Sequence, residues 1–465
     1  MNTKVQTDAK SAQATAKIAA CICEVTYETL DKDVVATVKR LIIDGIAVAM
    51  AGSNEAPPAL VADYVRDLGC TPRASVWGYG FKTSPAFAAY ANAVSMHVLD
   101  FEPMSNPPTH AVSPTVPGAL ALAESTSASG RDIVTACAKG FEMQGRLLIA
   151  GNLERGSFLF HTPGVVGLMG SAVSASHLLG LNAAQLASAL GIAASRCSGL
   201  SANTGSMVKC THCGNAAMAG LEGALMAQRG FTSHPGILEA GDGYVETFFR
   251  NHFDYDVLLA YGKPHRCVDP GMAIKFYPSK YPTQFAITAA LALRPSIADL
   301  SAIKQIRILT PEIEDADRPR PRSGLEGKFS FQYTVVTALL DGKVGMGSFT
   351  DELRFRPAIV ELLEKTAVVR NPALSRDTRK LRVEVEITLK DGTVHNNVCT
   401  KPPGFWGEPV NAELHRAKIQ DCLSVSLKEP QLGHTLELLD NLERLSAQEV
   451  GKLMGLLAGP EISVP

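Results

Sequence analysis

Several features that would identify a function at once are missing from this chain of 465 residues. It has no uninterrupted run of about 18 apolar residues, which argues against a membrane-spanning helix. Its 44 lysines and arginines nearly balance its 46 aspartates and glutamates, so the formal net charge is −2. No basic patch stands out, although nucleic-acid-binding proteins usually carry one. We therefore expect neither a nucleic-acid partner nor a membrane partner.

Cysteine is present, but not in an arrangement that fixes a function. The ten cysteines are scattered through the chain, without the density of a disulfide-stabilised secreted domain. Cys210 and Cys213 form one Cys-x-x-Cys pair, whereas a structural zinc site needs further ligands and a redox pair needs a βαβ context. The stretch "MNTKVQTDAKSAQATAKIAA" lacks the apolar core of a signal peptide, and we interpret it as an unstructured start. These observations predict buried thiols, no bound metal and a cytoplasmic location.

The first half of the chain contains a long series of helical patterns. Apolar residues recur every three or four positions from about residue 32 to residue 51, as in an amphipathic helix. The nearly uncharged stretches "GVVGLMGSAVSASHLLGL" and "NAAQLASALGIAASRCSGL" predict buried helices whose small residues allow close packing. Asn182 fits the N-cap of the second. We interpret residues 1–263 as the first part of an all-helical domain.

The pattern changes after about Gly262. "SAIKQIRILTP" alternates as a strand does, and "RKLRVEVEITLKDGTVHNNV" predicts a hairpin with its turn at Asp391-Gly392. Between them, "FSFQYTVVTALLDG" and "DELRFRPAIVELLEKTAVV" look helical. Residues 264–400 therefore predict an α+β lid domain, and residues 401–465 predict helices that return to the helical domain. The expected fold is mainly α: a large discontinuous all-helical domain with an inserted α+β lid domain.

Two residues at expected helix starts are candidates for chemistry. Lys209 precedes "GNAAMAGLEGALMAQ", where the helix dipole already carries positive charge. Such a lysine suits a bound anion or an easily lost proton, although an ordinary solvated lysine fits equally well. His161 precedes Thr162-Pro163 and a small-residue helix, where acid/base work or a simple capping role is open to it.

Further polar residues lie in expected loops. The Pro-rich stretch "HVLDFEPMSNPPTHAVSPTVPGA" carries four of them and is expected to connect two helices. "AIKFYPSKYPTQ" and "GKFSFQYTVVTALLDGKVG" could present cations to a cleft, or could be ordinary surface. The residues concerned are His97, Asp100, Glu102 and His110 in the first stretch, and Lys275, Lys280, Lys328 and Tyr333 in the other two.

Taken together, six ordered blocks resemble the MmgE/PrpD family over nearly the whole chain. They are "LIIDGIAVAMAGS", "AAYANAVSMHVLDFE", "FHTPGVVGLMGSAVSASHLLGL", "GSMVKCTHCGNAAMAGLEGALMAQRGF", "KFSFQYTVVTALLDG" and "PPGFWGEPVNAEL". The resemblance implies a homodimer that uses no cofactor, with a site between its two domains. It also implies substrates that are small di- or tricarboxylates. By motif match, the implied catalytic residues are Lys209, His161, Asp100 and His110, and the implied substrate-binding residues are Lys275, Lys280 and Tyr333.

The shared chemistry of such a site would be the removal of a proton next to a carboxylate. Residues 102–104, residues 279–283 and Asn215 differ from the usual family pattern around the expected site. We therefore expect an epimerase of an imino- or amino-dicarboxylate such as iminodisuccinate, in which Lys209 and His161 act on opposite faces of the carbon. The alternatives are a 2-methylcitrate-like dehydratase, a cis-aconitate-like decarboxylase, and a carboxylate-binding dimer without activity.

Overall fold

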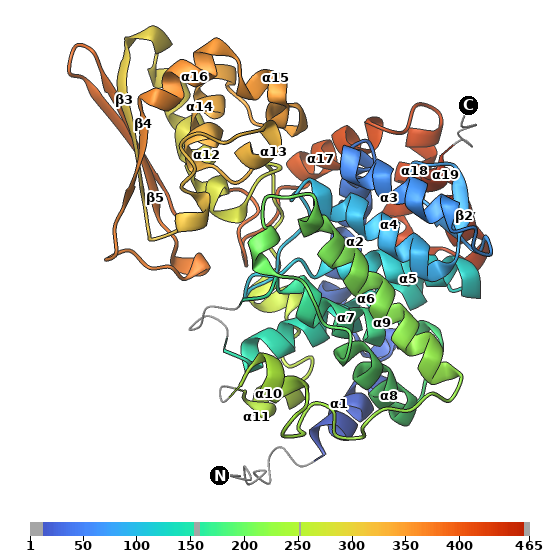
Figure 1. The fold of residues 1–465 in the computed structure, drawn as a ribbon. Coiled ribbons are helices and arrows are strands. Elements are labelled where there is room, and N and C mark those ends of the chain that lie inside the picture. The colour runs from blue at the N-terminus through green and yellow to red at the C-terminus, as the bar shows by residue number, and fades with distance from the viewer. Residues whose placement is uncertain (1–12, 153–158, 251–252, 460–465) are drawn as a thin grey trace. The chain divides into compact units, whose positions relative to one another are not determined.

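The computed structural model describes residues 13–152, 159–250 and 253–459 (Figure 1). The chain divides into two compact units. We call them the helical unit (Met1–Val98, Glu102–Ala273 and Asn411–Pro465) and the α+β unit (Leu99–Phe101 and Ile274–Val410). In the part of the chain that is described, no helix is both long and apolar enough to cross a membrane.

Helices build almost all of the helical unit. The packing centres on α9, which lies against α4, α7 and α8. The helices are α1 (Ala14–Glu24), α2 (Lys32–Gly52), α3 (Ala56–Asp67), α4 (Pro85–Val98), α5 (Val112–Thr126), α6 (Gly130–Ala150), α7 (Leu168–Leu178), α8 (Ala183–Ala194), α9 (Val208–Gln228), α10 (Tyr244–Phe248), α11 (Tyr255–Leu259), α17 (Ala412–Ser424), α18 (Gln431–Asp440) and α19 (Ala447–Ala458).

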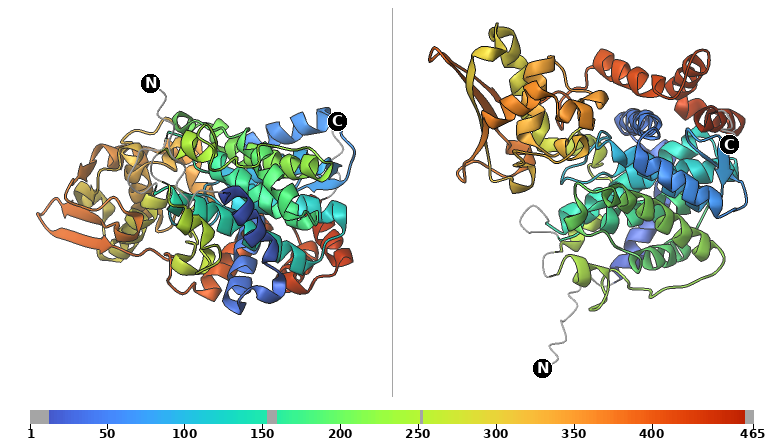
Figure 2. Two further views of the ribbon diagram at one scale, coloured as in Figure 1. Left: turned by 90° about the horizontal axis from the view of Figure 1, so that it is seen from below. Right: turned by 45° about the horizontal axis from the view of Figure 1, so that its top comes forward.

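Small residues let α9 sit at this central place. A Cβ atom on Gly220 would lie 2.4 Å from the carbonyl oxygen of Leu168 in α7, and one on Gly214 would lie 2.7 Å from the ring of Tyr90 in α4. Only glycine permits such close helix contacts. The C-terminal helices, red in Figure 2, belong to the same unit: α17 packs on α2, and α19 packs on α5.

The α+β unit is built on one four-stranded sheet with the order β4-β3-β5-β6. Strand β3 pairs in parallel with β4 and antiparallel with β5, so that Ile308 lies opposite Val385. Helix α12 packs on β5 and β6 and also contacts α14. The elements are α12 (Tyr281–Leu293), β3 (Ile303–Thr310), α13 (Gly324–Gly327), α14 (Phe331–Asp341), α15 (Asp351–Arg354), α16 (Pro357–Glu364), β4 (Thr366–Arg370), β5 (Val383–Leu389) and β6 (Val394–Cys399).

The predicted mainly helical fold is confirmed, and so are the β5–β6 hairpin and the N-cap at Asn182. Four details differ from the sequence analysis. The first half is not wholly helical, because β1 (Ala74–Val76) and β2 (Phe81–Thr83) form a small antiparallel pair. The end of the stretch "DELRFRPAIVELLEKTAVV", which we expected to be helical, forms β4, since β-branched valines suit a strand.

The other two differences concern helix ends. Residues 14–20, expected to be unstructured, begin α1, because Ile18 and Ile22 bury an apolar face in the core of the helical unit. Residues 1–12 lie outside the described part of the chain. His97, expected in a loop, belongs to the last turn of α4. The position of His97 in a helix matters for the site, because a helix fixes a side chain more firmly than a loop does.

Candidate active site

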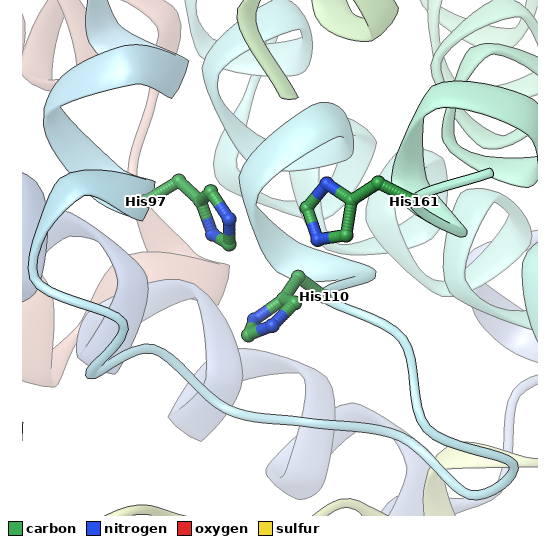
Figure 3. A group of neighbouring side chains, drawn as sticks. All are labelled: His97, His110 and His161. Carbon is green, nitrogen blue, oxygen red and sulfur yellow. The ribbon is translucent and has the colours of Figure 1, made fainter. Parts of the chain in front are cut away.

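Three histidine rings meet inside the helical unit (Figure 3). His97 comes from the end of α4, His110 from the segment just before α5, and His161 from the segment that leads into α7. The ring centres lie 4.4 Å apart for His97 and His110, 5.3 Å for His97 and His161, and 5.9 Å for His110 and His161. We call these three residues the histidine cluster.

The backbone holds His161 in place from both sides. Its N–H donates to the carbonyl of Gly199 at 2.8 Å, and its own carbonyl accepts from the N–H of Gly164 at 2.9 Å. A π-helical turn, Pro163–Gly167, follows at once and leads into α7. Such turns occur often at functional sites.

One buried carboxylate ties two of the histidines together. Oε1 of Glu102 accepts a short hydrogen bond from Nδ1 of His97 and another at 2.7 Å from the hydroxyl of Ser113. Nδ1 of His110 lies 3.0 Å from the same oxygen. Burial alone would raise the pKa of Glu102, but the adjacent imidazoles of His97 and His110 outweigh it and hold that pKa well below its usual range. Glu102 is therefore an anion that orients both rings.

Lys209 brings a cation to the cluster. It lies in the first turn of α9, and its Nζ is 2.9 Å from Nε2 of His97. Only 8% of the residue is exposed, so the interpretation as an ordinary solvated lysine is wrong. A carboxylate can only accept hydrogen bonds, so Nδ1 of His97 carries the hydrogen and Nε2 offers a lone pair to the ammonium group.

His212 extends the group by one helical turn of α9. Its Nδ1 lies 3.2 Å from Nδ1 of His161, and the two ring centres are 5.3 Å apart. His212, His97 and Glu102 are not among the site residues predicted from the sequence. The spacing of His212 from Lys209, three positions along the same helix, was the available signal, because residues at that spacing share a helix face.

These imidazoles are held in their neutral form. Burial, and then the charge of Lys209, lowers the pKa of His97 to about 3. The same two causes lower the pKa of His161 well below its usual value, and they also lower the pKa of His212. Neutral imidazoles beside an ammonium group can accept a proton or bind a metal ion, and the ammonium group attracts an anion. The candidate ligand nitrogens of the histidine cluster lie within 4.8 Å of one another.

The other four predicted site residues belong to the α+β unit. Nζ of Lys275 donates to Oδ1 of Asp100 at 2.5 Å and to the carbonyl of the same residue at 2.8 Å. Lys275 is 1% exposed and Asp100 is 4% exposed, so this is a buried ion pair. Asp100 adopts a left-handed backbone with φ of 51°. Aspartate tolerates that conformation better than most residues, and here it lets carbonyl and carboxylate meet the same ammonium group.

Lys280 and Tyr333 have partners within their own unit. Lys280 forms an ion pair with Asp315, and the hydroxyl of Tyr333 donates to the carbonyl of Ser348 at 2.5 Å. Tyr333 is fully buried, and burial raises its pKa. The structure thus brings Lys209, His110 and His161 together and pairs Asp100 with Lys275.

The two cysteines near Lys209 are ordinary thiols. Cys210 and Cys213 are buried in α9, and the Cys210 thiol donates to the carbonyl of Met207 at 3.0 Å. All ten cysteines are free of disulfide bonds. The expectation of buried thiols at this pair is confirmed.

Comparison with known proteins shows which family the chain resembles. The profile of the MmgE/PrpD N-terminal domain matches residues 16–256, and that of the C-terminal domain matches residues 277–444. Cis-aconitate decarboxylase of Mus musculus is 31% identical over 437 residues, which cover 91% of this chain and 89% of that protein. The protein of the same name from Aspergillus terreus is 26% identical and covers 93% of each chain.

A second named activity occurs among the relatives. The 2-methylcitrate dehydratase of Cupriavidus necator is 27% identical over 367 residues, which cover 71% of this chain and 73% of that protein. The names of these relatives are those of lyases, so they favour the lyase alternative of the sequence analysis and give no support to the epimerase. On the match of both domains and on the identity to the mouse protein, this chain belongs to the MmgE/PrpD family.

Proposed function

We propose that this chain is a lyase that removes carbon dioxide from a small unsaturated tricarboxylate resembling cis-aconitate. The observation that carries the proposal is the contact between the Lys209 ammonium group and the neutral His97 imidazole inside a buried histidine cluster. Similarity to cis-aconitate decarboxylases over most of the chain supports the same choice. Lys209 would bind a substrate carboxylate and stabilise the negative charge that develops during the reaction.

The reaction needs one proton and one cation. The bond between the departing carboxylate and its carbon breaks, and the electron pair forms a new carbon–carbon double bond. The electron pair of the former double bond moves to the carbon next to a second carboxylate, and that carbon takes up the proton. The products are carbon dioxide and an unsaturated dicarboxylate. A histidine that gains a proton when the anionic substrate binds can supply that proton, and we assign this role to His110 or His161.

The remaining assignments follow from the contacts and the motif matches. Glu102 and His97 position His110 and Lys209 rather than touch the substrate. Asp100 orients Lys275, which we assign to a substrate carboxylate. Lys280 and Tyr333 are proposed as substrate-binding residues on their motif matches alone. The homodimer, the absence of a cofactor and the cytoplasmic location also stay predictions.

Incubation of the purified protein with cis-aconitate in deuterated water tests the proposal. We expect carbon dioxide, together with an unsaturated dicarboxylate that carries one deuterium on carbon, detected by nuclear magnetic resonance. Unchanged cis-aconitate, with no carbon dioxide from related tricarboxylates, would refute it. A second incubation, with one stereoisomer of an amino-dicarboxylate, tests the epimerase. Deuterium at its α-carbon without release of carbon dioxide would support that activity instead.

A dehydratase is the second candidate, because the Cupriavidus necator relative carries that name. The same groups could serve it, with a base that removes the proton next to a carboxylate and an acid that protonates the departing hydroxyl group. Incubation with 2-methylcitrate separates the two candidates. The dehydratase gives an unsaturated tricarboxylate and water, and no carbon dioxide.

A further inference from the structure

We propose that the histidine cluster is also a binding site for a divalent transition-metal ion such as Zn²⁺, and that the metal ion and the carboxylate substrate exclude each other. The three rings come from separate segments and converge on one region (Figure 3). One nitrogen from each of His97, His110 and His161 lies within 4.8 Å of the other two. Three imidazoles with a fourth position left open form a common zinc arrangement.

Glu102 prepares two of these rings as ligands. Its Oε1 accepts from Nδ1 of His97 and lies 3.0 Å from Nδ1 of His110. A hydrogen on each Nδ1 leaves the lone pair on Nε2, which is the nitrogen that a metal ion would bind. A carboxylate behind a metal-binding histidine fixes its tautomer and orientation in the same way in known zinc sites. His212 lies behind the third ring, with its Nδ1 3.2 Å from Nδ1 of His161.

The position of Lys209 prevents the metal ion and the substrate from binding at the same time. Its ammonium group lies 2.9 Å from Nε2 of His97, so it uses the lone pair that the metal ion would take. A dication bound there would also repel the ammonium group from its place. Substrate binding needs Lys209 in position, and metal binding needs it displaced. Only the exclusion of substrate rests on the proposed function; metal binding itself does not.

Titration with Co²⁺, followed by its visible absorption and by metal analysis after gel filtration, tests the site without any turnover. We expect one equivalent per chain in the wild-type protein, which Zn²⁺ displaces. His110→Gln and His161→Gln each remove a ligand and should weaken binding at least about tenfold, and Glu102→Gln should weaken it by a similar factor. The matched control is His177→Gln, because His177 pairs with Lys139 outside the cluster.

Lys209→Met gives the sharpest result, because it should tighten Co²⁺ binding while it lowers turnover by about a hundredfold to a thousandfold. Weaker or unchanged metal binding in this variant would overturn the assigned competition. X-ray absorption of the Zn²⁺-loaded wild-type protein counts imidazole ligands without any substitution. Fewer than three, or a stoichiometry unaffected by His110→Gln and His161→Gln, would overturn the site. If the protein binds the metal ion but never releases carbon dioxide, the proposed function fails and the metal site stands.

Discussion

Nζ of Lys209 lies 2.9 Å from Nε2 of His97, and Nδ1 of the same ring donates to the carboxylate of Glu102. A cation, a neutral imidazole and an anion therefore form one hydrogen-bonded chain in the interior of the helical unit. Lys209 and His97 are 112 positions apart in sequence, and the close packing of α4 on α9 brings them together. A change at any member alters the charge or the tautomer of the next.

Substitution of Lys209 by methionine keeps an apolar side chain of similar length and removes the charge. We expect the rate of carbon dioxide release to fall by about a hundredfold to a thousandfold, as when one transition-state donor is lost elsewhere. The measurement is kcat/KM with cis-aconitate. Lys139→Met is the control, because Lys139 also lies beside a histidine, 3.1 Å from Nδ1 of His177, but outside the cluster. Equal losses in both variants would contradict the role of Lys209.

Substitution of Glu102 by glutamine tests the positioning of the two rings. An amide can donate as well as accept, so the hydrogens on Nδ1 of His97 and His110 are no longer fixed. We expect kcat to fall by about tenfold to a hundredfold while KM changes little. Glu102→Asp should recover part of the lost rate, because it restores the charge. An unchanged pH profile and kcat in Glu102→Gln would contradict the role, provided that thermal unfolding shows the variant to be folded.

Substrate binding should draw a proton into the site. Burial and Lys209 hold the pKa of His97 at about 3 and that of His161 well below its usual value, so both rings are neutral in the free protein at about pH 6. The negative charge of a bound tricarboxylate raises these pKa values. Calorimetry with tricarballylate, a saturated analogue, in buffers of different ionisation enthalpy should therefore report proton uptake that shrinks as the pH rises. Proton release on binding would contradict the proposed acid.

Much of the fold could be predicted from the sequence because local patterns determine it. The apolar repeats of α2, the N-cap at Asn182 and the turn at Asp391-Gly392 each depend on neighbouring residues alone. The strand formed by the "TAVV" stretch could not be predicted from neighbouring residues. It becomes a strand only because β3 offers it a parallel partner more than fifty residues earlier in the chain.

The same distinction applies to the site residues: those marked by local sequence could be predicted, and those that depend on distant partners could not. Lys209 and His161 drew attention through their place at helix starts, which is local information. Glu102 looked like one more polar loop residue, because its importance depends on His97 and His110 meeting it in space. His212 was hidden for the same reason, since only the packing of the His161 segment against α9 gives it a partner. A single sequence does not show which distant residues meet in space, and only the spacing of His212 from Lys209 along one helix pointed to this group.

Acid should destabilise the protein through its buried neutral histidines. Burial, and then Lys139, lowers the pKa of His177 to about 4, against an ordinary value of about 6.5. The unfolded chain thus binds more protons between these values, and folding loses free energy as the pH falls from about 6.5. Each such histidine contributes up to about 1.4 kcal/mol per pH unit in that window.

Urea unfolding between about pH 7 and about pH 5 measures this effect. The free energy of unfolding should fall with pH in the wild-type protein. It should fall less steeply in His177→Gln, which cannot take up the proton. Parallel curves for the two proteins would show that His177 is not protonated on unfolding in this range.

The segment that carries His161 tolerates no side chain at Gly164. A Cβ atom there would lie 2.1 Å from the carbonyl oxygen of Ser198, and the N–H of Gly164 already donates to the carbonyl of His161. Gly164→Ala should therefore lower the free energy of unfolding by about 1–3 kcal/mol and reduce kcat, because the backbone that positions His161 must move.

Gly451→Ala is the control, since that glycine lies inside α19 with nothing within 4 Å of its added Cβ. Alanine there should stabilise the helix by about 0.5–1 kcal/mol and leave kcat unchanged. A Gly164→Ala protein that is destabilised but fully active would show that catalysis does not depend on the position of this segment. That result would contradict a role of His161 in the proposed reaction.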